Sequence, residues 1–340
     1  MTSVRQTILI SSAILLLLTG PACGAAAPAT RPAPESTPSP TAMSTSENTP
    51  LPSMTPTPVN TPLPTATPAY DEEQMPTLPT PAMEGVIDVG GKHMLSYQCY
   101  GEGTPTEIVE AAAEDKPTLT LSWNAVILGV YPTTRICIYD RVPVNTIQDG
   151  AENLHALLGK IPLPGPYILV AHSLGGWYAR VFAHLYPNEV AGMIMVDTSL
   201  TYPDSPIALA TAYPTYSPDE AAGISQNRLS ESDIYTMMMP QFDGLDMKAS
   251  NEQVRQAGSF GDIPIVVICH TPGPQEFPGL DPVSEEIITA LILKVEANMA
   301  TLSSRSVFMV AATHQHFISE YQPQIIIDAI TWIMQEIRNK

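Results

Sequence analysis

The sequence is organised around one stretch, Tyr167-Ile168-Leu169-Val170-Ala171-His172-Ser173-Leu174-Gly175-Gly176. An apolar run that stops abruptly at a serine between small residues is typical of a buried strand followed by a tight turn. Such a turn holds the serine hydroxyl outward, and its strained backbone leaves no room for bulk two residues away. Ala171 and Gly175 are both small. The stretch therefore predicts that Ser173 is a nucleophile, the alternative being a serine that only occupies a turn.

The residues after this turn favour a helix. Apolar residues recur at helical spacing from Leu174 to Tyr186, and Pro187 ends the pattern. The backbone N–H of Leu174 would then lie at a helix N-terminus, where it can face an oxyanion. The whole stretch resembles the nucleophile elbow of the α/β-hydrolase superfamily, with Ala171 in place of the first glycine of G-x-S-x-G. The resemblance covers about Glu84 to Lys340.

This resemblance implies an α/β fold with a mostly parallel eight-stranded sheet flanked by helices. Apolar runs alternate with turn signals from about Glu84, as expected for βα units. The family also implies a cap between strands six and seven, here about 200–261, whose aromatic and methionine side chains either line an apolar pocket or pack the cap onto the sheet. The expected strands are 85–89, 93–99, 107–111, 135–139, the run from 167, 190–196, 263–269 and 307–312; the expected helices are 123–130, 151–158, 174–186 and 325–337.

A nucleophilic serine needs a base, and histidine serves near neutral pH. The run Ala312-Thr313-His314-Gln315-His316-Phe317-Ile318 follows the last expected strand and resembles the catalytic-histidine loop of the family. That resemblance aligns His316 with the base and leaves His314 as the alternative. We expect His172, beside the serine, to pack in the core or to support the site residues from behind, the alternative being a catalytic role.

The third member of the expected triad is a carboxylate that orients the imidazole. The usual position, after the strand that ends at Cys269, has no acid before Glu276 and Asp281. Asp197 ends the preceding strand, and its Val-Asp-Thr-Ser context resembles a subset of these hydrolases that carries the acid there. We therefore predict Asp197, with Asp281 and Glu276 as alternatives. Otherwise Asp197 is a strand-end aspartate that caps the next turn.

The expected oxyanion hole departs most from the family pattern. One donor is the N–H of Leu174, and the second comes from Ala112 or Ala113 after the strand 107–111. Relatives are rich in glycine there, whereas this chain continues with Glu114 and Asp115, whose charges would oppose an oxyanion unless they face solvent. Asp140 and Arg141, after the next strand, are expected to form a structural ion pair.

In the family's strand order, the strands that carry Cys99 and Cys137 are neighbours. An exported protein could join them by a disulfide. Cys269 lies within an apolar strand, and we expect an inert buried thiol.

The N-terminal part predicts export. Residues 1–23 carry one charge, Arg5, then an apolar core of about a dozen residues, which is shorter than the roughly 20 needed to span a bilayer. Gly20-Pro21-Ala22-Cys23 resembles a lipobox, so we expect lipidation at Cys23 and a place on the outer face of a bacterial cell membrane, with plain secretion as the alternative. Residues 24–83, rich in Pro, Thr and Ser, are expected to be a disordered linker before the domain 84–340.

The formal net charge of −19 argues against nucleic acid as a partner. No metal-ligand spacing, phosphate loop or cofactor motif is evident, and no obligate protein partner is expected. The sequence therefore predicts a serine hydrolase with the triad Ser173, His316 and Asp197, acting on a small-molecule ester or related acyl substrate through an acyl-enzyme. The alternatives are an amidase, peptidase or haloperoxidase-like activity on the same triad, or a non-catalytic binding module.

Overall fold

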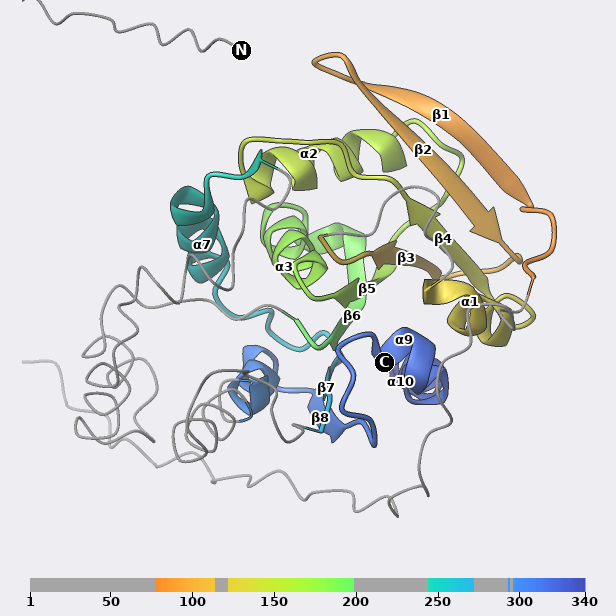
Figure 1. Cartoon of the computed structure of the whole chain (residues 1–340), viewed down its shortest axis with the longest axis vertical. Coiled ribbons are helices and arrows are strands. Elements are labelled where there is room, and N and C mark those ends of the chain that lie inside the picture. Colours follow the sequence, from red (N-terminus) through yellow and green to blue (C-terminus); the bar gives the residue numbers. More distant parts are fainter. Residues whose placement is uncertain (1–76, 114–121, 199–243, 272–292, 294–295, 340) are drawn as a thin grey trace, which may run out of the picture. The chain divides into compact units, whose positions relative to one another are not determined.

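The computed structural model describes residues 77–113, 122–198, 244–271, 293 and 296–339. Within these ranges the chain forms an eight-stranded sheet in the order β1-β2-β4-β3-β5-β6-β7-β8 (Figure 1). The pairs β1–β2 and β2–β4 are antiparallel, and every later pair is parallel. The predicted α/β class and the mostly parallel sheet are confirmed.

The burial of each strand explains its sequence. The parallel strands β5, β6 and β7 are covered on both faces, so they are almost continuously apolar. The edge strand β1 alternates between half-buried and exposed residues because only one of its faces meets the core. The strands are β1 (Met83–Gly90), β2 (His93–Tyr100), β3 (Thr106–Glu110), β4 (Arg135–Tyr139), β5 (Tyr167–His172), β6 (Val190–Val196), β7 (Ile265–Cys269) and β8 (Ser306–Val310).

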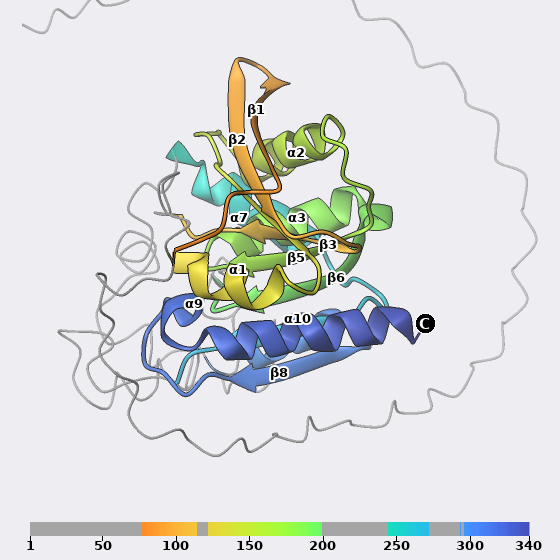
Figure 2. The ribbon, with the colours of Figure 1, turned by 90° about the vertical axis from the view of Figure 1, so that its right-hand side faces the viewer.

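Helices cover both faces of the sheet (Figure 2). A separate hydrophobic core lies between the helices and the sheet on each face. Helices α1 (Asn124–Val130) and α10 (Pro323–Arg338) pack on one face, and α2 (Ile147–Leu158), α3 (Gly175–Leu185) and α7 (Met247–Gln256) contribute to the layer on the other. Short helices include η3 (Pro187–Glu189), η5 (Ala300–Leu302) and α9 (Ile318–Tyr321). No helix among the described residues has the length and apolar character needed to cross a membrane.

Helix α2 begins four residues before the predicted start because of a capping box. The Thr146 hydroxyl accepts the Asp149 backbone N–H at 3.3 Å, and the Asp149 carboxylate accepts the Thr146 backbone N–H at 2.9 Å. These bonds satisfy two backbone donors that would otherwise lack partners at the helix end.

The segment predicted as a cap, about 200–261, is described from residue 244 onward. Helix α7 in this segment packs on the body of the domain: the Ser250 hydroxyl accepts the Ile147 N–H at 3.2 Å, and the Val254 carbonyl accepts a guanidinium N–H of Arg180 at 3.3 Å. Residues 247–256 therefore pack against α2 and α3. Residues 199–243, which hold most of the predicted cap, lie outside the described ranges.

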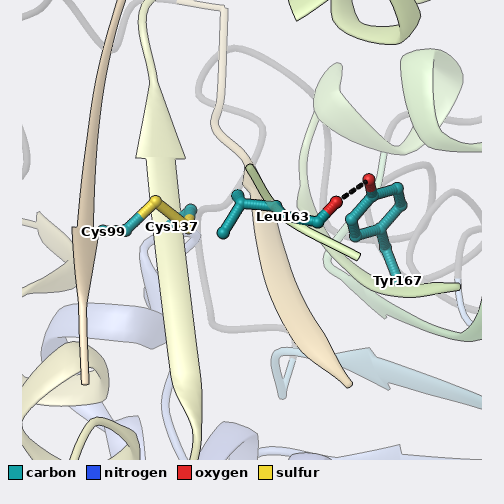
Figure 3. The surroundings of a disulfide bond; sticks show 4 residues. All are labelled: Cys99, Cys137, Leu163 and Tyr167. Carbon is teal, nitrogen blue, oxygen red and sulfur yellow. Dashed lines mark hydrogen bonds between the residues drawn. A yellow bond between two sulfur atoms is a disulfide. The ribbon is translucent and has the colours of Figure 1, made fainter. Parts of the chain in front are cut away.

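A disulfide joins Cys99 of β2 to Cys137 of β4 (Figure 3). The two cysteines are directly opposite each other in the antiparallel register, with Cα atoms 4.0 Å apart. Nearby, the Tyr167 hydroxyl donates to the Leu163 carbonyl at 2.8 Å and fixes the loop before β5 (Figure 3). Cys269 is a buried free thiol, and burial raises its pKa well above the usual value.

Candidate active site

Ser173 stands at the turn between β5 and α3. Its φ of 53° lies in the left-handed region, which is costly for a residue other than glycine. Its backbone N–H donates to the Val196 carbonyl at 3.1 Å, which ties the turn to the end of β6. Two residues on, a Cβ atom at Gly175 would lie 2.1 Å from the Glu110 carbonyl oxygen. Only glycine allows the first turn of α3 to approach the end of β3 this closely.

Asp197 directly follows β6 and has a similarly strained backbone, with a φ of 46°. Its N–H donates to the Ile268 carbonyl on the neighbouring strand at 2.6 Å. Its carboxylate is nearly buried, with 3% of the side chain exposed. Ser173 and Asp197 therefore lie at the carboxyl ends of adjacent parallel strands, where ligand sites of open α/β sheets form.

The structure distinguishes between the two candidate histidines. The His316 Nδ1 atom lies 2.6 Å from Oδ2 of Asp197. His314 Nδ1 instead lies 2.7 Å from the Thr271 carbonyl oxygen, and His314 is exposed. Since a carboxylate only accepts, His316 Nδ1 carries the proton and Nε2 is left as the basic nitrogen. The His316 side chain is 45% exposed, so this nitrogen is accessible.

A second imidazole, which the sequence analysis did not identify, binds the same carboxylate. His270 Nδ1 lies 2.8 Å from each oxygen of Asp197, and the His270 backbone N–H donates to Oδ1 at 3.1 Å. His270 follows β7 at the same edge of the sheet, in the loop where the family usually carries its acid. The signal available in the sequence was its position directly after a buried strand.

These donors determine the charge of Asp197. Burial by itself would raise the pKa of the carboxyl group, but the hydrogen bonds from His270 and His316, together with their charges, lower it well below the usual range. Asp197 is therefore ionised at any pH near neutrality.

His172 is fully buried and supports the His316 loop. Its Nε2 donates to the His316 carbonyl at 2.9 Å, and its ring packs edge-on against Phe317 with centroids 5.2 Å apart. Burial lowers its pKa to about 3, with a further contribution from His316, so the ring stays neutral. The contacts agree with its expected role as a packing residue.

The loop after β3 is held by a buried polar cluster. The Tyr139 hydroxyl donates to Glu110 Oε1 at 2.6 Å, and Arg141 Nη1 lies 3.4 Å from Glu110 Oε2. Arg141 also donates to the carbonyls of Ala111 and Ala112, each at 2.7 Å. The expected ion pair between Asp140 and Arg141 needs correction, because Arg141 reaches the neighbouring strand and pairs with Glu110.

Six of the predicted site residues thus gather at one edge of the sheet, after β3, β5, β6 and β8: Ser173, Leu174, Asp197, His316, Ala112 and Ala113. The alternative acids Glu276 and Asp281, the loop residues Glu114 and Asp115, and Cys23 lie outside the described ranges. In the part of the chain that is described, no group of three or more His, Cys, Asp or Glu residues is arranged to hold a metal ion.

No family model matches the chain. Among curated proteins, a protein of Hormonema carpetanum described as a probable transporter is 30% identical over 143 residues, which is 36% of this chain and 20% of that protein. An uncharacterised protein of Schizosaccharomyces pombe is 35% identical over 75 residues, or 19% of this chain and 14% of that protein. The chain thus spans about a fifth or less of these two relatives.

Solved structures that resemble the chain cover about three quarters of it. A haloalkane dehalogenase described as ancestral is 16% identical and covers 75% of this chain and 100% of its own, with a TM-score of 0.51. A bromoperoxidase from Bacillus anthracis is 12% identical over 74% of this chain and 100% of its own (TM-score 0.49), and a thermophilic esterase from Thermogutta terrifontis is 20% identical over 75% and 99% (TM-score 0.47). Together with the strand order, the first of these shows that the chain has the α/β-hydrolase fold.

Proposed function

We propose that the protein is a serine hydrolase that cleaves carboxylic esters through an acyl-enzyme. The observation that carries this proposal is the 2.6 Å bond between His316 and Asp197 at the edge of the sheet where the strained Ser173 turn lies. The bond fixes the tautomer of His316 so that Nε2 is available as a base. A buried, ionised carboxylate, an imidazole and a serine on a strained turn form the constellation that nucleophilic acyl transfer requires.

In the proposed reaction, Ser173 Oγ attacks the ester carbonyl carbon while its proton passes to His316 Nε2. The tetrahedral intermediate collapses when His316 returns the proton to the departing alcohol oxygen, which breaks the C–O bond and leaves the acyl group on Ser173. Water then attacks the acyl-enzyme by the same route and releases the carboxylic acid. Asp197 stabilises the imidazolium formed in each half of the cycle.

The negative charge on the tetrahedral oxygen needs donors that are already in place. Leu174 is the N-cap residue of α3, so its N–H group belongs to the positive end of that helix. The second donor is the N–H of Ala112 or Ala113. An amidase, a peptidase or a haloperoxidase-like enzyme would use the same machinery, and a panel of ester, amide and peroxide substrates would distinguish these activities.

The experiment that tests the proposal is labelling of the purified full-length protein by a fluorophosphonate probe, alongside hydrolysis of a short p-nitrophenyl ester. We expect both reactions in the wild type and neither in Ser173→Ala. Ser304→Ala, which removes an exposed hydroxyl elsewhere, serves as the matched control and should behave as the wild type. A folded wild type that is not labelled and does not hydrolyse esters would refute the proposed hydrolase activity and favour a non-catalytic binding module. Export and lipidation at Cys23 stay predictions.

A further inference from the structure

The loop after β3 lies between the ends of β5 and β4. In the sheet, β3 has β5 on one side, which leads to Ser173, and β4 on the other, which leads to Arg141. Glu110 pairs with Ala171 in the parallel register, so the residues after Glu110 emerge beside the serine turn. The loop that should supply the second oxyanion donor is therefore placed between Ser173 and Arg141.

The side chain of Arg141 contacts backbone atoms of this loop. Its Nη1 donates to the Ala111 carbonyl and its Nη2 to the Ala112 carbonyl, and both bonds are 2.7 Å long. A guanidinium group is a rigid planar fork, so two such bonds to successive carbonyls fix the orientation of both peptide planes. In a trans peptide the C=O and N–H bonds point in opposite directions. With both carbonyls on Arg141, the N–H groups of Ala112 and Ala113 are turned away from it.

We propose that Arg141 is a positioning residue for the oxyanion hole, which aims the N–H groups of Ala112 and Ala113 toward the site of Ser173. This inference rests on the proposed function and explains how a loop without the glycines of relatives still presents a donor. Glycine-rich loops reach such orientations through their own backbone freedom. An alanine loop has less freedom, and here a side chain on the neighbouring strand fixes the peptides instead.

The guanidinium is itself held from several sides. Glu110 lies 3.4 Å away, and its carboxylate is fixed in turn by the Tyr139 hydroxyl at 2.6 Å. The Arg141 guanidinium carbon also lies 4.6 Å from the centre of the Tyr178 ring on α3, a cation–π contact. Because 10% of the Arg141 side chain and none of the Glu110 side chain is exposed, solvent screens these contacts little.

The test compares Arg141→Lys with a matched control. Lysine keeps the charge but offers a single ammonium group, which cannot hold two carbonyls in the same fixed geometry. Arg305→Lys is the control, because Arg305 also pairs with a glutamate, Glu336, and also donates to a backbone carbonyl, at 3.0 Å, but on the side of β8 and α10. Each variant is assayed for kcat and KM with a p-nitrophenyl ester, for inhibition by phenylboronic acid and for its thermal melting temperature.

For Arg141→Lys we expect kcat to fall by about 10- to 100-fold with little change in KM, because a misaligned donor affects the transition state more than the bound ester. Inhibition by phenylboronic acid, whose adduct with a serine mimics the tetrahedral oxyanion, should weaken in parallel. Arg305→Lys should keep wild-type kcat and boronate inhibition even if its melting temperature falls. A merely structural role would instead lower the melting temperature of both variants and leave kcat unchanged.

Two results would overturn the inference while leaving the hydrolase intact: wild-type kcat and boronate inhibition in a folded Arg141→Lys, or equal losses in the two lysine variants. If Arg141→Lys does not fold, Glu110→Gln assayed above pH 8 gives the answer, since Glu110 is ionised there and glutamine keeps an oxygen for Tyr139 while it removes the charge partner of Arg141. It should lower kcat several-fold without changing KM, and an unchanged kcat counts against the inference. A wild type without labelling or turnover refutes the proposed function itself, and the inference with it.

Discussion

Asp197 and Glu110 are both buried carboxylates at the carboxyl ends of parallel strands, yet their environments act in opposite directions. Asp197 receives three N–H groups, one each from the His316 and His270 rings and one from the His270 backbone. Glu110 receives the Tyr139 hydroxyl at 2.6 Å, while Arg141 lies farther away at 3.4 Å. The pKa of Asp197 is held well below its usual range, whereas burial raises the pKa of Glu110 to about 7 despite the nearby Arg141 charge.

The difference shows that burial alone does not set the charge of a carboxyl group in this domain. Desolvation is the largest single contribution at both sites, and the number of short donor bonds decides whether it is overcome. At Asp197 two of the three donors are imidazole groups, and one of these must carry a positive charge during the proposed reaction. Near Glu110, the bonds from Arg141 to the two backbone carbonyls are shorter than its contact with the carboxylate, so its guanidinium serves the loop as much as the carboxylate.

Removal of the charge at Asp197 should have the largest effect. In Asp197→Asn the amide no longer stabilises an imidazolium, and it can donate to His316 Nδ1 and so favour the wrong tautomer. We expect kcat for a p-nitrophenyl ester to fall by about 10³- to 10⁴-fold. If a folded Asp197→Asn keeps kcat within tenfold of the wild-type value, another acid, such as Asp281 or Glu276, orients the base.

A smaller loss is expected at His270, which donates to Asp197 but is not the proposed base. His270→Asn removes the ring donor shared by the two Asp197 oxygens and keeps the backbone N–H bond. One hydrogen bond of this kind corresponds to a loss of about 3- to 10-fold in kcat. His314→Asn is the control, because His314 contacts only the Thr271 carbonyl among the contacts seen here, and its kcat should stay within about twofold of wild type. A greater loss at His314 than at His270 would contradict the assignment.

Much of the fold follows from short segments of sequence. The apolar runs 135–139 and 190–196 coincide with β4 and β6, and the starts and ends of the other strands lie close to those predicted. The positions of Ser173, Asp197 and His316 at strand ends were also predictable, since parallel strands bring their carboxyl ends to one edge. Local periodicity and the chain order of the three residues carry this information.

Other contacts depend on which strands are neighbours in the sheet. His270 binds Asp197 because β7 lies beside β6, and Arg141 binds Glu110 because β4 lies beside β3. Read locally, His270 looks like a loop residue and Arg141 like the partner of Asp140. The Asp140 interpretation fails because pairing across strands brings Arg141 to Glu110 on the neighbouring strand, and the loop position of His270 alone does not reveal its bond to Asp197. The early start of α2 is different, since the Thr146-x-x-Asp149 capping signal was present in the sequence.

Substitution of Glu107 should have the smallest effect on catalysis. Glu107 also extends the comparison of Asp197 and Glu110 to a third buried carboxyl group. It lies on β3 three residues before Glu110 and is fully buried. Neither carboxyl oxygen has a partner at hydrogen-bonding distance within the described residues, and the nearby Glu107 backbone and Thr134 side chain lower the pKa less than burial raises it. Burial therefore raises the pKa of Glu107 from 4.5 to about 8. It is the carboxylate with the fewest donors of the three.

A pKa that is raised in the folded state makes stability depend on pH with a definite sign. The unfolded chain loses the Glu107 proton near pH 4.5, whereas the folded chain keeps it up to about pH 8. Between these values the folded state binds more protons, so the free energy of unfolding falls as pH rises through this window and levels off above it. In Glu107→Gln this contribution is absent. We expect the variant to gain on the order of a few kcal/mol relative to wild type between pH 5 and pH 8, with kcat unchanged.

The measurement is urea unfolding of wild type and Glu107→Gln at pH 5, 6.5 and 8, with Glu102→Gln as the control at an exposed position. The stability difference between wild type and Glu107→Gln should grow with each step in pH, while Glu102→Gln follows the wild type throughout. A constant difference across the range would mean that Glu107 ionises at its ordinary pKa and has donors in the folded protein. In that case burial at β3 would be offset as it is at Asp197, and the contrast between β3 and Asp197 would rest on Glu110 alone.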